Sequence, residues 1–317
     1  MKYLVLVLSI VTVFCGCKKD SVDNSNDNPN NPVNLNTSIN RVFSKSAVVD
    51  GYVLYDGGHS VTERGICYST SSSPTTANNK ISNGNGEGTY STIVPGLSPT
   101  STYYARAYAI NDIGTVYGNE INFTTEADLE SVQIGTQVWT AKNLNVDYFK
   151  NGEFIPNVQE NVFWAQLNSA SGCWWQNNLS YGVQYGKLYN WYAVIDPRGL
   201  APEGWHIPTE TEWNTLINYL GGTTVAGGKL KEAGNSHWQA PNTGADNSSG
   251  FTGLPGSCRN GDFTGEFPYS IGEDGLWWSA TEISNQAKCF LLSKDNASIF
   301  NALSNKQSGF AIRCVKD

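Results

Sequence analysis

The clearest helical pattern of the chain lies between residues 209 and 220. Apolar side chains recur there at the spacing of one helix face, namely Trp213, Leu216, Ile217 and Leu220. Thr209 and Glu212 have the spacing of a capping box, in which each side chain binds the backbone N–H of the other residue. Glycines at 221 and 222 end the pattern. We therefore predict an amphipathic helix that begins at Thr209 and stops before Gly221.

Residues 38–125 follow a different pattern, in which short β-type runs alternate with turn residues and no helical period appears. The period-two reading of the run 103–110 puts Tyr103 and the alanines at 105, 107 and 109 on one face. We predict an all-β sandwich for this module. The stretch from Gly96 to Tyr103 resembles the tyrosine corner of fibronectin type III modules, which implies that the Tyr103 hydroxyl folds back onto upstream backbone.

Residues 126–317 form the second predicted module. Its first pattern is a hairpin around Gly135-Thr136, and all ten tryptophans of the chain lie between Trp139 and Trp278, so we expect the largest core here. Over the whole chain, charged residues make up only 15%, aromatics make up 12%, and there are 32 glycines. This composition is typical of short strands and turns rather than long helices.

The N-terminal residues have the pattern of an exported lipoprotein. Residues 1–16 carry one lysine and then an apolar run that is too short to span a bilayer core of about 30 Å, so they are expected to be a signal peptide. Gly16-Cys17 resembles a bacterial lipobox, which implies lipid attachment at Cys17. Residues 17–37, rich in Asn, Asp and Pro, are predicted to be a disordered tether. Acidic residues after the cysteine resemble an outer-membrane export signal, which implies a lipid-anchored protein facing the exterior; the alternative is a linker without an addressing role.

Residues 131–317 carry several landmarks in order, among them Gly227 to Lys231, Trp277 to Glu282 and the closing Gly-Phe-x-x-Arg-Cys-Val-Lys-Asp that ends at Asp317. Together they resemble the Fibrobacter succinogenes major paralogous domain. That family is similar to the C-type lectin-like and formylglycine-generating-enzyme folds, whose helix start is similar to Pro208–Trp213 here. The resemblance implies an α+β domain, C-type lectin-like, with short helices, twisted antiparallel strands and long loops.

Residues with metal or redox chemistry do not form a recognisable motif. His206 and His237 each lack a second His or Cys at ligand spacing, so no metal and no cofactor are expected. The pairs Asp246-Asn247 and Asp295-Asn296 could hold calcium, but such pairs are typical of turns. The formylglycine-generating enzymes use two closely spaced cysteines, whereas Cys289 and Cys314 are 25 residues apart. No catalytic residue is therefore predicted.

Two further sets of residues are candidates for function or stability. In the pairs Trp174-Trp175 and Trp277-Trp278, strand alternation would point one indole outward, which predicts a sugar-stacking platform; the alternative is that these indoles are core. Cys173, Cys258, Cys289 and Cys314 form an even set in an exported domain, from which we expect at least one disulfide, with Cys314 as the first candidate. The alternative is four buried thiols. Cys67, alone in its module, is expected to be a buried free thiol.

These patterns favour a non-catalytic lipoprotein displayed on the cell surface. Its terminal lectin-like domain is expected to bind an extracellular polysaccharide or glycoprotein, without calcium. The alternative is a structural or assembly protein that acts through protein–protein contacts, and the third possibility is a formylglycine-generating-enzyme-like enzyme. The formal charge of -8 comes with no basic patch, so nucleic acid is not expected as a partner. The expected partners are the membrane, through the anchor, and a polysaccharide or surface protein.

Overall fold

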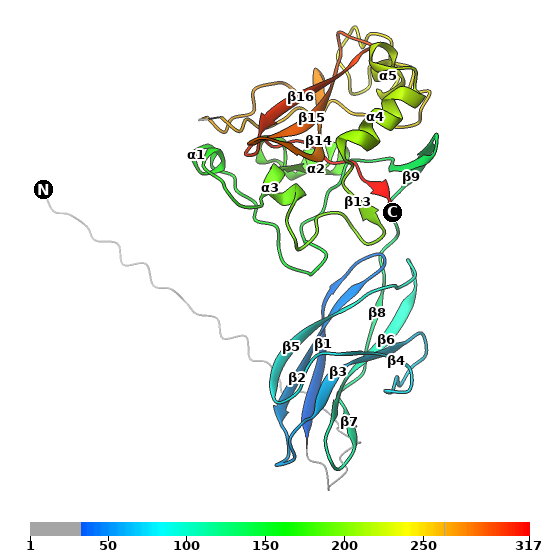
Figure 1. Cartoon of the computed structure of the whole chain (residues 1–317), viewed down its shortest axis with the longest axis vertical. Helices are drawn as coiled ribbons and strands as arrows, with labels where there is room; N and C mark the ends of the chain where they lie inside the picture. The colour runs from blue at the N-terminus through cyan, green and yellow to red at the C-terminus, as the bar shows by residue number, and fades with distance from the viewer. Residues whose placement is uncertain (1–32, 263) are drawn as a thin grey trace, which may run out of the picture.

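The computed structural model describes residues 33–262 and 264–317. They form two modules that follow one another along the chain, an elongated β module and a rounder one that carries the helices (Figure 1). The predicted signal peptide, Cys17 and residues 17–32 of the tether lie outside the described residues. The prediction of a disordered tether is wrong for residues 34–37, which belong to the first strand of the sandwich because Leu35 and Thr37 are buried there. Among the helices of the described part, none is long and apolar enough to cross a membrane.

Two antiparallel sheets pack face to face in the first module. One has the order β1-β2-β5 and the other the order β4-β3-β6-β7, with β8 also paired to β6. The strands are β1 (Asn34–Val42), β2 (Ala47–Tyr55), β3 (Glu63–Ser69), β4 (Asn79–Ser82), β5 (Gly88–Val94), β6 (Thr102–Ile110), β7 (Thr115–Tyr117) and β8 (Ile121–Thr124). Their inward side chains make one core that includes Val49, Ile66 and Ala107. The expected β-sandwich is therefore observed.

Tyr103 occupies the position predicted for it. Tyr103 and the alanines at 105, 107 and 109 are all buried in the sandwich core, which confirms the period-two reading of β6. The Tyr103 hydroxyl accepts the backbone N–H of Ser98 at 3.0 Å, and this is the fold-back that a tyrosine corner implies. Its ring also stacks on Phe123 of β8, so the residue ties the loop before β6 to the neighbouring strand.

The second module combines short helices with antiparallel strands and long loops, which is the α+β character expected of it. Its sheets have the orders β13-β17-β10-β9, β11-β12 and β14-β15-β16. The strands are β9 (Ser131–Ile134), β10 (Gln137–Thr140), β11 (Gly172–Cys173), β12 (Leu188–Tyr189), β13 (Trp205–His206), β14 (Asp274–Ile283), β15 (Gln286–Ser293), β16 (Ile299–Asn305) and β17 (Val315–Lys316). The helices are α1 (Asn161–Ala165), α2 (Leu179–Tyr185), α3 (Trp191–Val194), α4 (Glu210–Tyr219) and α5 (Thr223–Leu230), with a single 3₁₀ turn at Trp175–Asn177.

Helix α4 has the ends and the buried face that its sequence predicts. Thr209 is the N-cap, and its capping box with Glu212 is complete. Trp213, Leu216 and Ile217 are buried, and the helix ends before Gly221, whose φ of 102° suits glycine. The predicted hairpin is also confirmed, since β9 and β10 pair across Gly135-Thr136.

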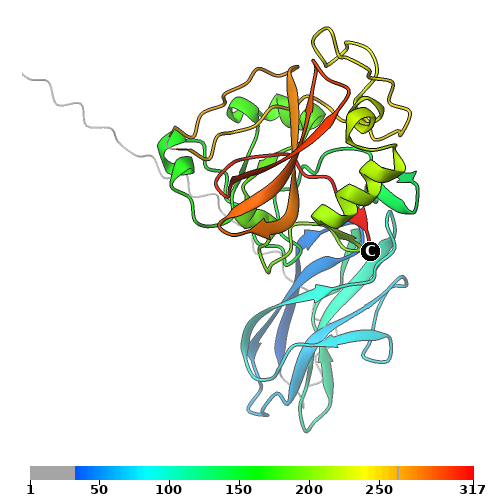
Figure 2. The same cartoon turned by 45° about the horizontal axis from the view of Figure 1, so that its top comes forward.

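The sheet β14-β15-β16 runs through the middle of the second module, with α4 beside it (Figure 2). One face packs on a core that contains Trp213, Phe251 and Trp277. The opposite face packs on a second core that contains Tyr189 and Trp278. Neighbouring residues of β14 therefore enter two different cores.

Candidate functional site

The tryptophan pair at 277 and 278 is fully buried, so the prediction of an exposed platform there is wrong. The prediction assumed that one face of β14 is open to solvent, whereas both faces are covered. Trp277 donates its indole N–H to Asn143 Oδ1 at 2.8 Å, and Trp278 donates to the carbonyl of Tyr189 at 2.8 Å. Both indole rings are therefore buried, and both N–H groups are already hydrogen-bonded within the domain.

In the pair at 174 and 175, only Trp175 is buried. Trp175 is 9% exposed and packs edge-to-face with Tyr181 at 4.9 Å. Trp174 is half-buried, with the Lys187 ammonium 4.4 Å from its ring centroid and Gly182 against its pyrrole edge. Trp175 is therefore a packing residue, and Trp174 is held in place by its contacts with Lys187 and Gly182.

The cysteines do not form the predicted disulfide. All five within the described residues are free and buried, Cys67 as expected and Cys173, Cys258, Cys289 and Cys314 against expectation. The physical reason is that the thiols fill apolar cores as small side chains, three in the core around Trp278 and Cys173 beside Trp164. Burial raises the pKa of Cys258, Cys289 and Cys314 to about 12, which disfavours the reactive thiolate.

The histidines of the second module pair with carboxylates. His237 Nδ1 lies 2.8 Å from both carboxylate oxygens of Glu232. His206 contacts Asp317 through Nδ1 at 2.7 Å and Glu212 through Nε2 at 2.6 Å. Within residues 33–262 and 264–317, no group of three or more His, Cys, Asp or Glu side chains is arranged to hold a metal ion.

The acidic-amide pairs considered for calcium are turn residues in the structure. Asp246 Oδ1 accepts the N–H of Ser248 at 2.8 Å, and Asn247 Oδ1 accepts the N–H of Thr252 at 2.9 Å. Asn296 Oδ1 likewise accepts from Ser298. These oxygens serve the local backbone, as the turn interpretation implies.

Three buried cations fasten the loops of the second module through backbone carbonyl groups. The Arg313 guanidinium donates to the carbonyls of Thr140 at 2.6 Å and Phe251 at 2.8 Å, as well as to two further oxygens. The Lys231 ammonium donates to three carbonyls at 2.8 to 2.9 Å. Arg259 donates to the carbonyls of Gly265, Val158 and Gln159. The role of these cations is structural, because each is fully or almost fully buried.

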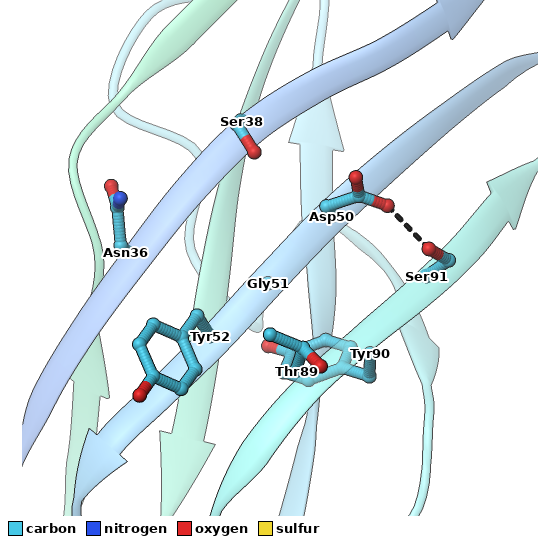
Figure 3. Close-up of a pocket in the computed structure, with 8 residues that line it drawn as sticks. All are labelled: Asn36, Ser38, Asp50, Gly51, Tyr52, Thr89, Tyr90 and Ser91. Carbon is cyan, nitrogen blue, oxygen red and sulfur yellow. Dashed lines mark hydrogen bonds between the residues drawn. The ribbon is translucent and has the colours of Figure 1, made fainter.

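A groove lies on the outer face of the sheet β1-β2-β5 in the first module. Its volume is about 550 Å3. The strand register builds it from two cross-strand rows, which are Asn36–Tyr52–Thr89 and Ser38–Asp50–Ser91. Figure 3 shows these six side chains on the three neighbouring strands. The alternation of each strand points them outward, while residues such as Val49 and Val53 enter the core.

The chemistry of this outer groove is that of neutral hydrogen bonding around one carboxylate and one aromatic ring. Ser91 Oγ donates to Asp50 Oδ1 (Figure 3). Asn40 Nδ2 donates to Asp50 Oδ2 at 2.9 Å, so the carboxylate is held in place. The Tyr52 ring is 39% exposed. No Lys or Arg is among the residues that line the groove. The site can thus offer hydroxyl, amide and carboxylate groups together with an aromatic face.

The floor of the groove depends on Gly51. The Tyr90 ring passes beneath this glycine, and a Cβ at position 51 would come within 2.1 Å of Tyr90 Cζ. Tyr90 then donates its hydroxyl to the carbonyl of Gly65 in the opposite sheet at 2.9 Å. Glycine is therefore required here for the close packing of β2 on the Tyr90 ring.

Sequence reasoning missed this groove, although part of its signal was present. The short run Val33 to Asn36 alternates apolar and polar residues, as a half-exposed strand does. That pattern alone does not say which strands lie beside it. The grouping of residues 36, 52 and 89 follows from pairing between distant segments, which the local pattern does not encode.

The second module matches a known protein family. The model of the Fibrobacter succinogenes major domain matches residues 132–316, more than half of the chain. The chain belongs to this family. The match agrees with the resemblance that the sequence landmarks indicate. No curated protein matches the chain.

The Fibrobacter succinogenes major domain ends with the segment that carries Arg313, so its closing motif coincides with the buried guanidinium described above. The groove, in contrast, is built from residues 36–91 and lies outside the matched region. The two modules therefore differ in construction: the second is a loop-rich domain held by buried cations, and the first is a sandwich with an open polar face.

Solved structures similar to the chain include fibronectin type III-like domains. The sensor domain of the anti-sigma factor RsgI4 from Pseudobacteroides cellulosolvens is 19% identical, covers 31% of this chain and 97% of its own, and has a TM-score of 0.24. A fibronectin type III domain of human fibronectin type III domain containing protein 3 is 16% identical, covers 31% of this chain and 88% of its own, and has a TM-score of 0.23.

Proposed function

We propose that this protein is a non-catalytic, surface-displayed lipoprotein that binds an extracellular polysaccharide, or the glycan of a glycoprotein, in the groove of its first module. The observation that carries the proposal is the groove itself, with hydroxyl, amide and carboxylate groups ordered around an exposed tyrosine. This moves the predicted contact from the terminal domain to the sandwich, because Trp277 and Trp278 are buried.

The groove suits a neutral sugar chain. A carboxylate and amide side chains bind sugar hydroxyl groups, and the face of a tyrosine ring packs against the apolar face of a pyranose. Because no cation lines the groove and Asp50 stands at its centre, an anionic glycan would be repelled. One aromatic contact is worth about 1 kcal/mol, so we expect weak binding that many anchored copies strengthen by avidity.

The anchor belongs to the same proposal. Acylation of Cys17 and an address in the outer membrane are supported by the lipobox resemblance and the acidic tether. More than one acyl chain gives stable attachment, since each buried CH₂ contributes about 0.8 kcal/mol.

We also propose a C-type lectin-like fold for the terminal domain, supported by the similarity of its α4 start and by its short helices between antiparallel strands.

Assembly through protein contacts is the second candidate function, and one observation favours it. Four apolar side chains on two short helices are more than half exposed: Val162 and Phe163 on α1, and Leu179 and Val183 on α2. Exposed apolar residues of this kind are typical of protein interaction sites. Val183 is the most exposed of them, at 84%.

A glycan array followed by calorimetry tests the proposed function. The full-length protein should bind at least one neutral polysaccharide with or without a chelator. Tyr52→Ala and Asp50→Asn should each weaken binding about tenfold, whereas Tyr269→Ala, an exposed tyrosine of the second module, should not. Binding unchanged in both groove variants would refute the groove as the sugar site. No binding to any glycan would refute the sugar role and leave assembly as the function.

Metabolic labelling tests the anchor. A fatty-acid probe should mark the wild-type protein and should fail to mark Cys17→Ala. Cys15→Ala is the matched control, because it removes the neighbouring thiol and leaves the expected acceptor. A label that persists in Cys17→Ala would disprove the assignment.

A further inference from the structure

Val48 reveals where the second module meets the groove face. On β2 it is in register with Ile93, which is 42% exposed, so Val48 also faces outward. Nevertheless only 2% of Val48 is exposed. Gly152 of the second module covers it, since a Cβ built on that glycine would lie 2.8 Å from Val48 Cγ2.

Arg41 provides a second contact on the same face. It is the register partner of Val48 on β1, and its guanidinium carbon lies 3.5 Å from the centroid of the Tyr148 ring. Tyr148 pairs with Phe154 in an isolated antiparallel bridge that closes a tight turn. We call residues 148–154 the junction turn. Two independent contacts thus put the junction turn on the outer face of the sheet that carries the groove.

The junction turn lies directly beside the groove. Val48 and Asp50 are two residues apart on one strand, which corresponds to about 7 Å at the rise of a β-strand. Covering Val48 therefore closes the end of the groove next to the row Ser38–Asp50–Ser91. Beyond Tyr52, at the other end, Leu54 is 53% exposed, so that end is open.

The turn presents an ordered aromatic pair at this closed end. The rings of Tyr148 and Phe154 are 5.6 Å apart in an edge arrangement, and Phe154 is 52% exposed. The backbone is fixed by a hydrogen bond from Phe149 N to Glu153 O at 2.9 Å and another from Lys150 N to Gly199 O at 2.8 Å. A rigid aromatic side chain loses little entropy on contact with a ligand.

We propose that the binding site is composite, and that a glycan lying in the groove continues onto the junction turn, where Phe154, supported by Tyr148, forms an end subsite. The inference rests on the proposed function of the groove. It gives the second module a direct part in recognition, and it predicts that affinity depends on ligand length. A short sugar fills the groove alone, and a longer one also contacts the aromatic pair.

Calorimetry with the full-length protein in detergent tests the composite site. The probes are cello-, laminari-, manno- and xylo-oligosaccharides, each as disaccharide and as hexasaccharide. Phe154→Ala should lower the affinity for the hexasaccharide about five- to tenfold and leave the disaccharide within about twofold. Phe163→Ala is the matched control, because this phenylalanine of α1 is 66% exposed and should change neither affinity.

Tyr148→Phe is a second control in the same turn. It removes only the hydroxyl group and keeps the ring that stacks on Arg41. It should bind both lengths like the wild type. If Phe154→Ala leaves the hexasaccharide affinity unchanged while Asp50→Asn weakens it, the composite site is refuted and the groove stands. An equal loss at both lengths would also overturn it, since the turn would then only support the fold. If no probe binds, the proposed function fails and the composite site fails with it.

Discussion

Arg313 joins two distant backbone segments of the second module, at Thr140 and at Phe251-Thr252. Burial without a carboxylate partner lowers the pKa of its guanidinium, yet the carbonyls of Thr140 and Phe251 both need its N–H groups. We expect Arg313→Ala to reduce the free energy of unfolding by about 3 to 5 kcal/mol, because it leaves buried acceptors unsatisfied and a cavity behind. Urea unfolding followed by tryptophan fluorescence measures this loss.

The control for that experiment is Arg198→Ala. Arg198 pairs with Asp196 and Glu153 at the surface, where its side chain is 32% exposed. Surface pairs contribute about 1 kcal/mol or less. An equal loss of unfolding free energy in Arg313→Ala and Arg198→Ala would contradict the claim that the buried guanidinium stabilises the protein more than a surface one.

His206 makes the stability of the second module sensitive to pH. Partial burial opposes protonation, but the hydrogen bonds to Glu212 and Asp317 prevail and raise the pKa of His206 above 6.5. A raised pKa in the folded state means that the stabilisation is complete below the unfolded pKa and is lost as pH rises through the folded one. We expect the urea midpoint to fall as pH rises from about 6 to about 8. His206→Gln should flatten this dependence, and a slope that survives in the variant would disprove it.

At the scale of elements, α4 could be predicted because its signals are local. The cap, the apolar stripe and the terminal glycine all lie within residues 209–221, so a short stretch of sequence contains every signal for this helix. Thr209→Ala should destabilise the protein by about 1 kcal/mol, whereas Thr209→Ser keeps the oxygen that accepts from Glu212 N and should be nearly neutral. Thermal unfolding of both variants compares them. An equal shift would mean that the methyl group, rather than the cap, matters.

Strand β14 could not be predicted in the same way. The prediction that Trp277 or Trp278 is exposed holds only if one face of β14 meets water. The sequence of the strand does not show which segments cover its two faces. Two separate cores form on its faces, from segments as distant as Trp139 and Phe310. The groove was missed for a related reason, since its rows join β1, β2 and β5 across loops.

At the scale of the whole molecule, Asp128 links the two modules. Its Oδ2 atom pairs with Lys45 of the first module at 2.7 Å, and its Oδ1 atom accepts from the Trp205 indole at 3.3 Å. We expect Asp128→Ala to loosen the junction and increase the maximum dimension seen by small-angle X-ray scattering. Glu130→Ala is the control from the same seam, because Glu130 pairs with Lys142 on the exposed surface. Identical scattering from wild type and Asp128→Ala would show that this carboxylate is dispensable.

The buried cations carry a consequence for how freely the second module can vary. Every residue has a backbone carbonyl oxygen. A loop that is held through these oxygens therefore keeps its hydrogen bonds when its side chains change. The Lys231 ammonium, for example, binds the carbonyls of residues 243, 293 and 296, whatever side chains these positions carry. A library randomised at those three positions should yield mostly folded protein, whereas Lys231→Met should unfold readily. The loops of this domain are therefore free to acquire new surfaces while the fold that presents them stays the same.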